Sequence, residues 1–170
     1  MAAKRPSNIV LIGMPGAGKS TIGPVLAEKT SRDFLDTDAV IQAGQKRTLQ
    51  EIVNTDGQAA LRQIEEEVLL SLALQNHVIA TGGSAVYSEH GMRHLKSDGI
   101  IFFLDAELAA LKSRIDNFDG RGLVKQPEQS FAQLFTERLP LYRKFADSTI
   151  DCTGLKPEDV CARIITALKN

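Results

Sequence analysis

The sequence has few residues that bind metals or form disulfides. It contains two cysteines, Cys152 and Cys161, and three histidines in 170 residues. No metal-ligand spacing joins either cysteine to a histidine, and His90 and His94, although four positions apart, lack a third ligand. We therefore expect the cysteines to be ordinary reduced thiols and the histidines to face solvent or cap helices.

An excess of charge and long apolar runs are also missing. Lysine and arginine number 20 against 21 acidic residues, so nothing in the charge balance favours nucleic acid or an anionic membrane as a partner. The longest apolar runs, NIVLIG and GIIFFLD, are far shorter than the roughly 18 residues that span a bilayer. The first residues, MAAKRPS, lack the apolar core of a signal peptide. We expect a cytoplasmic protein.

Short apolar segments alternate with longer amphipathic ones along the whole chain. The predicted strands are 8–13, 33–38, 77–82, 99–105 and 148–152, and the predicted helices are 19–30, two within 48–76, 106–115, 130–146 and 157–169. Because the strands are apolar on both faces, they belong in a parallel sheet covered by helices. The sequence therefore predicts one three-layer α/β/α domain over residues 1–170, with a mobile surface loop at 116–127.

A phosphate-binding loop follows the first predicted strand. The segment GMPGAGKST, residues 13–21, has the pattern G-x-x-x-x-G-K-S and opens the first predicted helix. Its glycines let successive N–H groups point at an anion, and the helix N-terminus adds positive potential. Lys19 can reach the β- and γ-phosphates, and the Ser20 hydroxyl can join a Mg²⁺ shell. The predicted nucleotide-binding residues are Gly13, Gly16, Ala17, Gly18, Lys19, Ser20 and Thr21.

A phosphate loop shows only that a nucleotide is bound, because GTPases, motor ATPases and small kinases all share it. The chain is too short for a helicase or motor core, and it contains no Asn-Lys-x-Asp motif for reading guanine. A small kinase is the remaining class. Its acceptor must be identified from the residues that follow the other strands.

Two aspartates end the second predicted strand, in the segment LDTD. Asp36 and Asp38 are two positions apart, so in an extended segment both lie on one face, at the carboxyl edge where open α/β sheets bind ligands. One carboxylate could hold Mg²⁺ through water while the other accepts a hydrogen bond from an attacking hydroxyl. The alternative is that DTDAVI begins a short helix with Asp38 as its N-cap.

Three arginines are candidates for binding anionic groups. Arg62 is in a helical segment with Glu65 and Glu66 three and four residues on, so an ion pair within the helix is the alternative to ligand binding. Arg121 lies between two glycines, where a cation suits a lid over transferring phosphates. Arg138 lies two residues before a proline that disrupts the predicted helix and helps to fix its geometry.

In this order, the motifs resemble those of the shikimate kinase family over nearly the whole chain. The matching segments are GMPGAGKST, FLDTD, GQAALRQIE, IATGG and ERLPLYRKFAD. The resemblance implies ATP- and Mg²⁺-dependent phosphorylation of the 3-hydroxyl of shikimate to shikimate 3-phosphate, a step of aromatic amino acid biosynthesis. It also implies a P-loop fold like that of nucleoside-monophosphate kinases, with five parallel strands in the order 2-3-1-4-5, usually as a monomer.

The resemblance assigns roles around the transferred phosphate. Asp38 would orient or deprotonate the acceptor hydroxyl, Asp36 would help to hold Mg²⁺ through water, and Arg121 would approach the phosphoryl group from the lid. Arg114 would lie over adenine, and Thr153, in the segment DCTGLKPE, would border the same base pocket. The expected catalytic residues are Lys19, Asp38 and Arg121, and the expected metal-binding residues are Ser20 and Asp36.

The acceptor itself would be bound within and beyond the region 36–66. By resemblance, Arg62 and Arg138 would grip the carboxylate of the substrate, a task that suits guanidinium groups. Gly82 and Gly83 would offer backbone contacts to the substrate, because they follow the third predicted strand in the segment TGGSAV. The predicted substrate-binding residues are Asp38, Arg62, Gly82, Gly83 and Arg138.

Three departures from the family pattern concern the substrate and the lid. The usual triple glycine ends in Ser84, the usual Arg-Pro-Leu-Leu of the lid is RGLV, and Gln58 and Leu61 replace Glu and Phe near Arg62. A negative φ at Ser84 would leave the substrate contact intact, whereas a positive φ would strain a serine and point to another acceptor. The open alternatives are a kinase of another hydroxy acid, such as gluconate, and a non-catalytic ATP-binding homologue.

Overall fold

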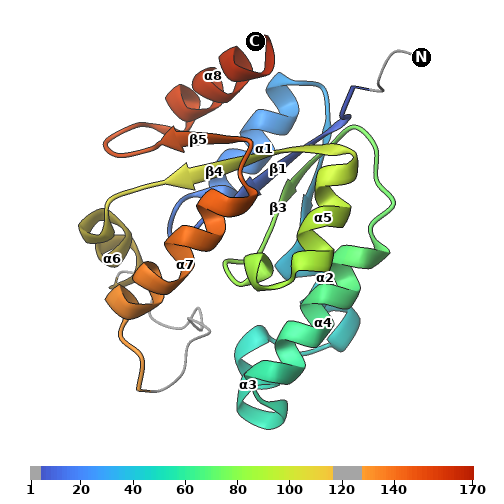
Figure 1. Cartoon of the computed structure of the whole chain (residues 1–170), viewed down its shortest axis with the longest axis vertical. Helices are drawn as coiled ribbons and strands as arrows, with labels where there is room; N and C mark the ends of the chain where they lie inside the picture. The colour runs from blue at the N-terminus through green and yellow to red at the C-terminus, as the bar shows by residue number, and fades with distance from the viewer. Residues whose placement is uncertain (1–4, 117–127) are drawn as a thin grey trace.

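The computed structural model describes residues 5–116 and 128–170. Its centre is a parallel sheet of five strands in the order β2-β3-β1-β4-β5 (Figure 1). The strands are β1 (Asn8–Ile12), β2 (Asp33–Asp36), β3 (His77–Ala80), β4 (Gly99–Asp105) and β5 (Ser148–Asp151). The predicted strand order is confirmed. Residues 117–127, which include Arg121 and almost all of the predicted lid, lie outside the described residues.

Helices cover both faces of the sheet, which confirms the three-layer architecture. On one face α1 (Lys19–Lys29) packs against α8 (Pro157–Leu168), and α5 (Glu89–Ser97) and α7 (Phe131–Phe145) lie across the other (Figure 1). The remaining helical segments connect these layers or extend beyond them: α2 (Thr37–Gln45), α3 (Leu49–Asp56), α4 (Gln58–Ser71), the short 3₁₀ helix η1 (Ala85–Tyr87) and α6 (Leu108–Asp116).

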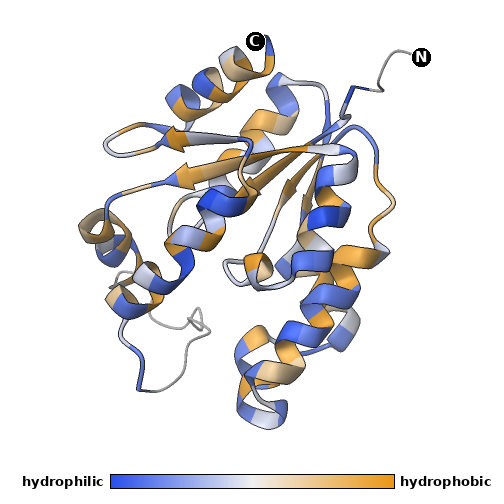
Figure 2. Cartoon of the chain, viewed as in Figure 1, coloured by the Kyte–Doolittle hydropathy of each residue, from blue (hydrophilic) through white to orange (hydrophobic). Residues whose placement is uncertain are grey.

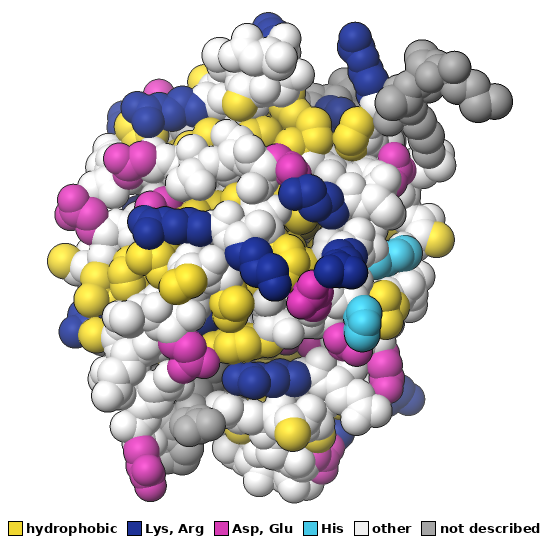
Figure 3. Space-filling view, in the orientation of Figure 1, with side chains coloured by type: hydrophobic (Ala, Val, Ile, Leu, Met, Phe, Trp, Pro, Cys, Tyr) yellow, Lys and Arg dark blue, Asp and Glu magenta, His cyan; other side chains and the backbone are white. Residues whose placement is uncertain are grey.

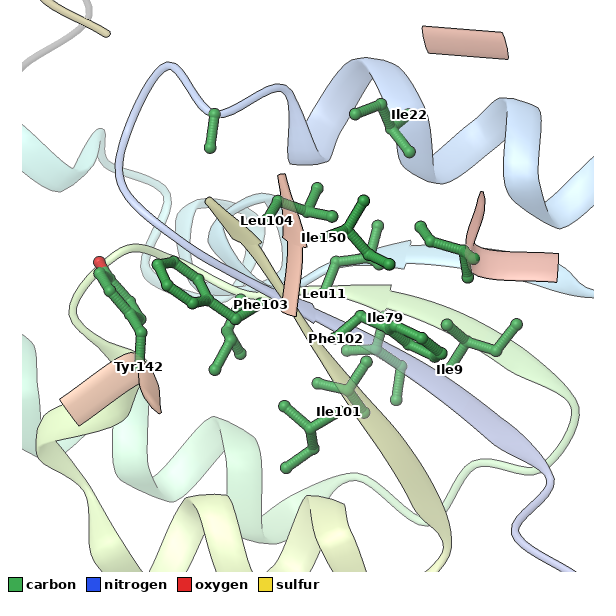
Figure 4. Close-up of a cluster of buried hydrophobic side chains, with 14 of the residues drawn as sticks. Ile9, Leu11, Ile22, Ile79, Ile101, Phe102, Phe103, Leu104, Tyr142 and Ile150 are labelled. Atoms are coloured by element: carbon green, nitrogen blue, oxygen red, sulfur yellow. The ribbon is translucent and has the colours of Figure 1, made fainter. Parts of the chain in front are cut away.

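The core forms where the apolar strands meet the helices. All residues of β1 are buried, because a central parallel strand is covered on both faces. The central strands are mostly hydrophobic (Figure 2). Side chains of β1, β3 and β4 pack together with Ile22 of α1 and Tyr142 of α7 (Figure 4). The ring of Tyr142 stacks on Phe103 with 5.1 Å between ring centroids. This packing holds α7 against the sheet and thereby positions the other residues of that helix.

A second, smaller apolar cluster holds α2, α3 and α4 together. Its buried members are Ile41, Ile52 and Leu61, one from each helix. Gly57 joins α3 to α4 with a φ of 91°, a conformation that side chains rarely adopt. The three helices therefore form a compact wall that stands beyond the carboxyl end of β2 and β3 (Figure 1).

Helix α5 was not predicted, and α2 was predicted only as an alternative to a longer second strand. The second predicted strand continued through Asp38, but β2 ends at Asp36 because that side chain caps α2. Helix α5 begins at the cap Ser88, whose hydroxyl accepts the N–H of Gly91, and buries Met92 and Leu95. With nine residues and two buried apolar side chains, α5 is too short to be stable alone and depends on packing against its neighbours.

The surface over α5 and α7 mixes charges of both signs (Figure 3). Glu89 pairs with Arg93 and Lys144, and Lys96 pairs with Asp147. In the part of the chain that the structure describes, no helix is long and apolar enough to cross a membrane.

The contact between α1 and β2 gives a stability prediction. A Cβ added to Gly23 would lie 2.3 Å from Cε2 of Phe34, so Gly23→Ala forces the ring or the helix to move. We expect Gly23→Ala to lower the free energy of unfolding by about 1–3 kcal/mol in urea titrations. Gly44→Ala in α2 is the matched control, because a Cβ there meets nothing within 4 Å. It should leave stability unchanged or raise it by about 0.5–1 kcal/mol; equal losses in both variants would contradict the packing explanation.

Candidate active site

The carboxyl ends of β1, β2 and β3 open into one cavity of about 620 Å³. Its walls come from the phosphate loop, the start of α2, helices α3 and α4, and the segment after β3. Arg114 and Arg138 close it from α6 and α7. The predicted phosphate loop therefore meets four of the five predicted acceptor residues, Asp38, Gly82, Gly83 and Arg138, whereas Arg62 is not part of the described cavity wall.

The phosphate loop has the backbone conformation that its glycines allow. Gly13, Gly16 and Gly18 have φ values of 151°, 85° and 98°, which side chains rarely adopt. Lys19 begins α1 and is buried, and its Nζ donates to the carbonyls of Gly13 at 2.6 Å and Met14 at 3.0 Å. Burial lowers the pKa of Lys19 to about 8, although Asp38 and Asp36 oppose the shift. The ammonium group thus lies inside the curve of the loop.

Asp36 and Asp38 do not share one face of an extended strand, so that prediction is wrong. Asp36 is the last residue of β2 and the N-cap of α2, and its Oδ1 accepts the N–H groups of Asp38 at 2.9 Å and Ala39 at 3.4 Å. The predicted alternative, a helix at this point, is found, but Asp36 caps it instead of Asp38. A side-chain oxygen at the N-cap satisfies N–H groups that the first helical turn leaves unpaired, which stops the strand here.

The second oxygen of Asp36 faces the phosphate loop. Its Oδ2 accepts a hydrogen bond of 3.1 Å from the Ser20 hydroxyl. The two residues predicted to bind metal are therefore in contact, one from α1 and one from β2. In residues 5–116 and 128–170, no group of three or more His, Cys, Asp and Glu side chains is placed to hold a metal ion.

Two carboxylates approach each other across Gly82. A Cβ on this residue would lie 2.5 Å from Oδ1 of Asp38 and 2.7 Å from Oε1 of Glu65, so only glycine leaves them room. Burial raises the pKa of Asp38 to about 6, and Asp36 adds to the shift while Lys19 opposes it. Burial also raises the pKa of Glu65 to about 7. The sequence offered Glu65 as a possible helix ion-pair partner and as the last residue of the family-like segment GQAALRQIE, but it was given no role in the cavity.

Gly83 is required for the same reason, close approach. A Cβ there would lie 2.8 Å from Nη1 of Arg138 and 2.9 Å from Cδ of Pro15. The carbonyl of Gly83 accepts a 2.7 Å hydrogen bond from the Tyr142 hydroxyl. The N–H of Gly82 donates to Thr37 Oγ1 at 3.2 Å, so this group is already engaged within the protein.

Ser84 is unstrained, with φ −93° and ψ −1°. Its hydroxyl donates a 2.5 Å hydrogen bond to Oε2 of Glu65, 19 positions earlier in the chain. Because the φ of Ser84 is negative, the serine does not exclude the substrate contact that the resemblance implies.

The two arginines predicted to grip a carboxylate differ in their surroundings. Arg138 is buried at 3% exposure and lines the cavity beside Gly83. Arg62 is exposed on α4, and its guanidinium carbon lies 4.0 Å from the ring centroid of Tyr87. Arg138 faces the same ring at 5.5 Å. Among the described residues Arg62 makes no ion-pair contact with Glu65 or Glu66, although its charge opposes the rise that burial causes in the pKa of Glu65.

Tyr87 was not singled out in the sequence, and it is the residue that brings the two arginines together. It lies on η1, and its hydroxyl donates a 2.6 Å hydrogen bond to Glu137 of α7. The face of an aromatic ring attracts guanidinium groups, so the ring of Tyr87 offsets part of the repulsion between the two arginines.

Of the two residues predicted to contact the nucleotide base, one lines the cavity and the other does not. Arg114 lines the cavity, and its Nη1 donates to the carbonyl of Gly16 at 2.7 Å, which places it against the phosphate loop. Thr153 follows β5, and its N–H donates to Oδ1 of Asp151 at 3.0 Å. Thr153 is not part of the cavity wall in the described part of the chain.

Comparisons with known proteins agree with this geometry. The family model "Shikimate kinase" matches residues 15–169. A shikimate kinase of Thermodesulfovibrio yellowstonii is 41% identical over 93% of this chain and 92% of its own length. The structure titled "Shikimate kinase from Acinetobacter baumannii in complex with shikimate" is 33% identical, superposes with a TM-score of 0.87, and the match covers 98% of this chain and 94% of that one.

A second solved structure, the shikimate kinase of Aquifex aeolicus, is 31% identical with a TM-score of 0.79, covering 95% of this chain and 96% of that one. The family model and these relatives span almost the entire sequence, from the phosphate loop to α8. The chain belongs to the shikimate kinase family.

Proposed function

We propose that this chain transfers the γ-phosphoryl group of ATP to the 3-hydroxyl of shikimate in the cavity at the carboxyl edge of the sheet. One observation carries the proposal: the phosphate loop, the buried carboxylate of Glu65 and the buried guanidinium of Arg138 line the same cavity. The chain is an ATP-dependent phosphotransferase by family, and the solved relative from Acinetobacter baumannii is titled as a complex with shikimate. A small hydroxy acid carrying one carboxylate fits that set of groups.

The phosphate loop holds the nucleotide. The N–H groups of the loop and the N-terminus of α1 bind the phosphates, and Lys19 moves from the loop carbonyls to the β- and γ-phosphate oxygens. Arg114 stays beside the loop and covers the base, and Thr153 borders it. Arg121, in the segment 117–127, completes the charge neutralisation from the lid.

The acceptor lies across the cavity from the loop, in the region 36–66 and the segment after β3. Asp38 accepts the proton of the attacking hydroxyl, and burial raises its pKa to about 6, closer to neutral pH, where a general base is most effective. Arg138 binds the substrate carboxylate, with Arg62 beside it on the ring of Tyr87. Of the two glycines, Gly83 is the better backbone donor, because Gly82 already donates to Thr37.

The residues present fit a magnesium ion. Ser20 and Asp36 supply hard oxygen atoms in mutual contact beside the phosphate loop, which is the donor type that Mg²⁺ prefers. With two protein side chains at the site, most of the ligands would be water and phosphate oxygens. When bound, the ion supplies positive charge to the transferred phosphoryl group. We propose that the enzyme acts as a monomer, as the resemblance to the family implies, and that it works in the cytoplasm.

A coupled assay of ADP release tests the acceptor. The panel is shikimate, quinate, gluconate and nucleoside monophosphates, each at millimolar concentration with ATP and Mg²⁺. We expect shikimate to give the highest kcat/KM. A higher value with gluconate would identify a kinase of another hydroxy acid. ATP binding without acceptor-dependent turnover would identify a non-catalytic homologue.

Asp38→Asn tests the catalytic base. The amide cannot take the proton, so we expect kcat to fall by about 10²–10⁴-fold while the Kd of ATP stays within a factor of two or so. Asp33→Asn is the matched control, since Asp33 is exposed at the start of β2, the strand that leads into α2. A comparable loss of ATP binding in Asp38→Asn would move Asp38 from the acceptor to the nucleotide.

Asp36 has two functions that two substitutions separate. Asparagine caps helices as well as aspartate does, so Asp36→Asn should keep the stability and raise the Mg²⁺ concentration for half-maximal activity by about tenfold or more. Asp36→Ala should do the same and also lose about 1 kcal/mol of stability with the cap. An unchanged magnesium dependence in Asp36→Asn would leave Asp36 as a cap alone.

A further inference from the structure

We propose that Ser84 is a positioning residue of the acceptor pocket, whose hydroxyl holds the Glu65 carboxylate with one oxygen turned toward Gly82 beside Asp38. The proposal rests on the proposed function and concerns the position at which this chain departs from the triple glycine of its family. The replacement of the third glycine by Ser84 would then affect how the acceptor is bound.

The geometry of the carboxylate carries the argument. Oε2 of Glu65 accepts the 2.5 Å hydrogen bond from Ser84, and Oε1 lies on the side of Gly82, 2.7 Å from where a Cβ would be. One oxygen is therefore held by the protein and the other is presented to the cavity. A glycine at position 84 has no side chain to make this bond, and the carboxylate could then rotate.

The backbone around Ser84 supports the same conclusion. Ser84 precedes η1 in an ordinary right-handed conformation, so the serine costs no strain. Gly82 and Gly83 leave no room for a Cβ, whereas position 84 accommodates one and directs it at α4. The side chain at 84 is the one in this segment that can reach Glu65 without blocking the cavity.

Charge explains why the hydrogen bond matters. Glu65 is 3% exposed, and burial raises its pKa while the Ser84 hydroxyl lowers it. Asp38 of α2 repels its charge, and Arg138 of α7 and Arg62 of α4 stabilise it. Burial raises the pKa of Tyr142 of α7, and the charge of Glu65 adds to that shift. A hydroxyl that donates to the ionised form keeps Glu65 an acceptor for a substrate hydroxyl near neutral pH.

The sign of the pH effect follows from these contacts. Removing a donor to the ionised form raises the pKa of Glu65, so the carboxylate takes up a proton at a higher pH. For Ser84→Ala and Ser84→Gly we expect the acid limb of the kcat/KM profile for shikimate to move up by about one pH unit. The KM for shikimate at pH 7 should rise severalfold, and the Kd of ATP should not change. Ser84→Thr, which keeps the hydroxyl, should restore the wild-type profile.

The control and a second readout separate this proposal from the proposed function. Ser97→Ala removes a hydroxyl that donates to the carbonyl of His94 on exposed α5, and it should leave the profile unchanged. A ¹³C NMR titration of the Glu65 carboxyl, assigned with Glu65→Gln, measures its pKa in the free protein without any turnover. A higher pKa in Ser84→Ala supports the proposal even if shikimate proves not to be the acceptor. Equal Glu65 pKa values in the two proteins, or a loss of thermal stability with an unmoved pH profile, would overturn it.

Discussion

Four ionisable side chains are largely removed from solvent in one cavity, and charges of opposite sign offset the cost of removing them from water. Lys19, Glu65 and Arg138 are buried, and Asp38 is partly so. Two of them are cations and two are anions. Burial lowers the pKa of Lys19 and raises that of Asp38, and the charge of each opposes the shift in the other. A single charge of this kind would be costly to bury, whereas a mixed set is tolerated and stays reactive.

Bringing these charges together requires the backbone to come close. Gly82 lies between two carboxylates and Gly83 lies against a guanidinium, in both cases at distances where a Cβ would collide. Neither glycine is needed for a left-handed conformation, in contrast to the glycines of the phosphate loop. The two adjacent glycines after β3 therefore make space for charged side chains, and a tight turn is a secondary result.

Much of the architecture was predictable because it depends on local patterns. The uniformly apolar strands predict a buried parallel sheet. The phosphate loop is recognisable because phosphate binding needs particular residues at fixed spacing. The small core of Ile41, Ile52 and Leu61 and the helix α5 were harder to predict, since each buries few apolar residues and depends on neighbours from other elements. Pro24 and Pro140 lie inside α1 and α7, which continue through them, and nothing in the structure explains Pro24.

The sequence by itself determined the nucleotide side of this protein, because the phosphate loop is a contiguous segment whose chemistry follows from residues next to one another. The acceptor side was decided by the tertiary structure. Asp36 contacts Ser20 of the phosphate loop, Glu65 lines the cavity and accepts a hydrogen bond from Ser84, and Tyr87 lies beside two arginines from different helices. These partners are far apart in the chain, so only the packing of helices on the sheet brings their charges and hydroxyls within reach of one another.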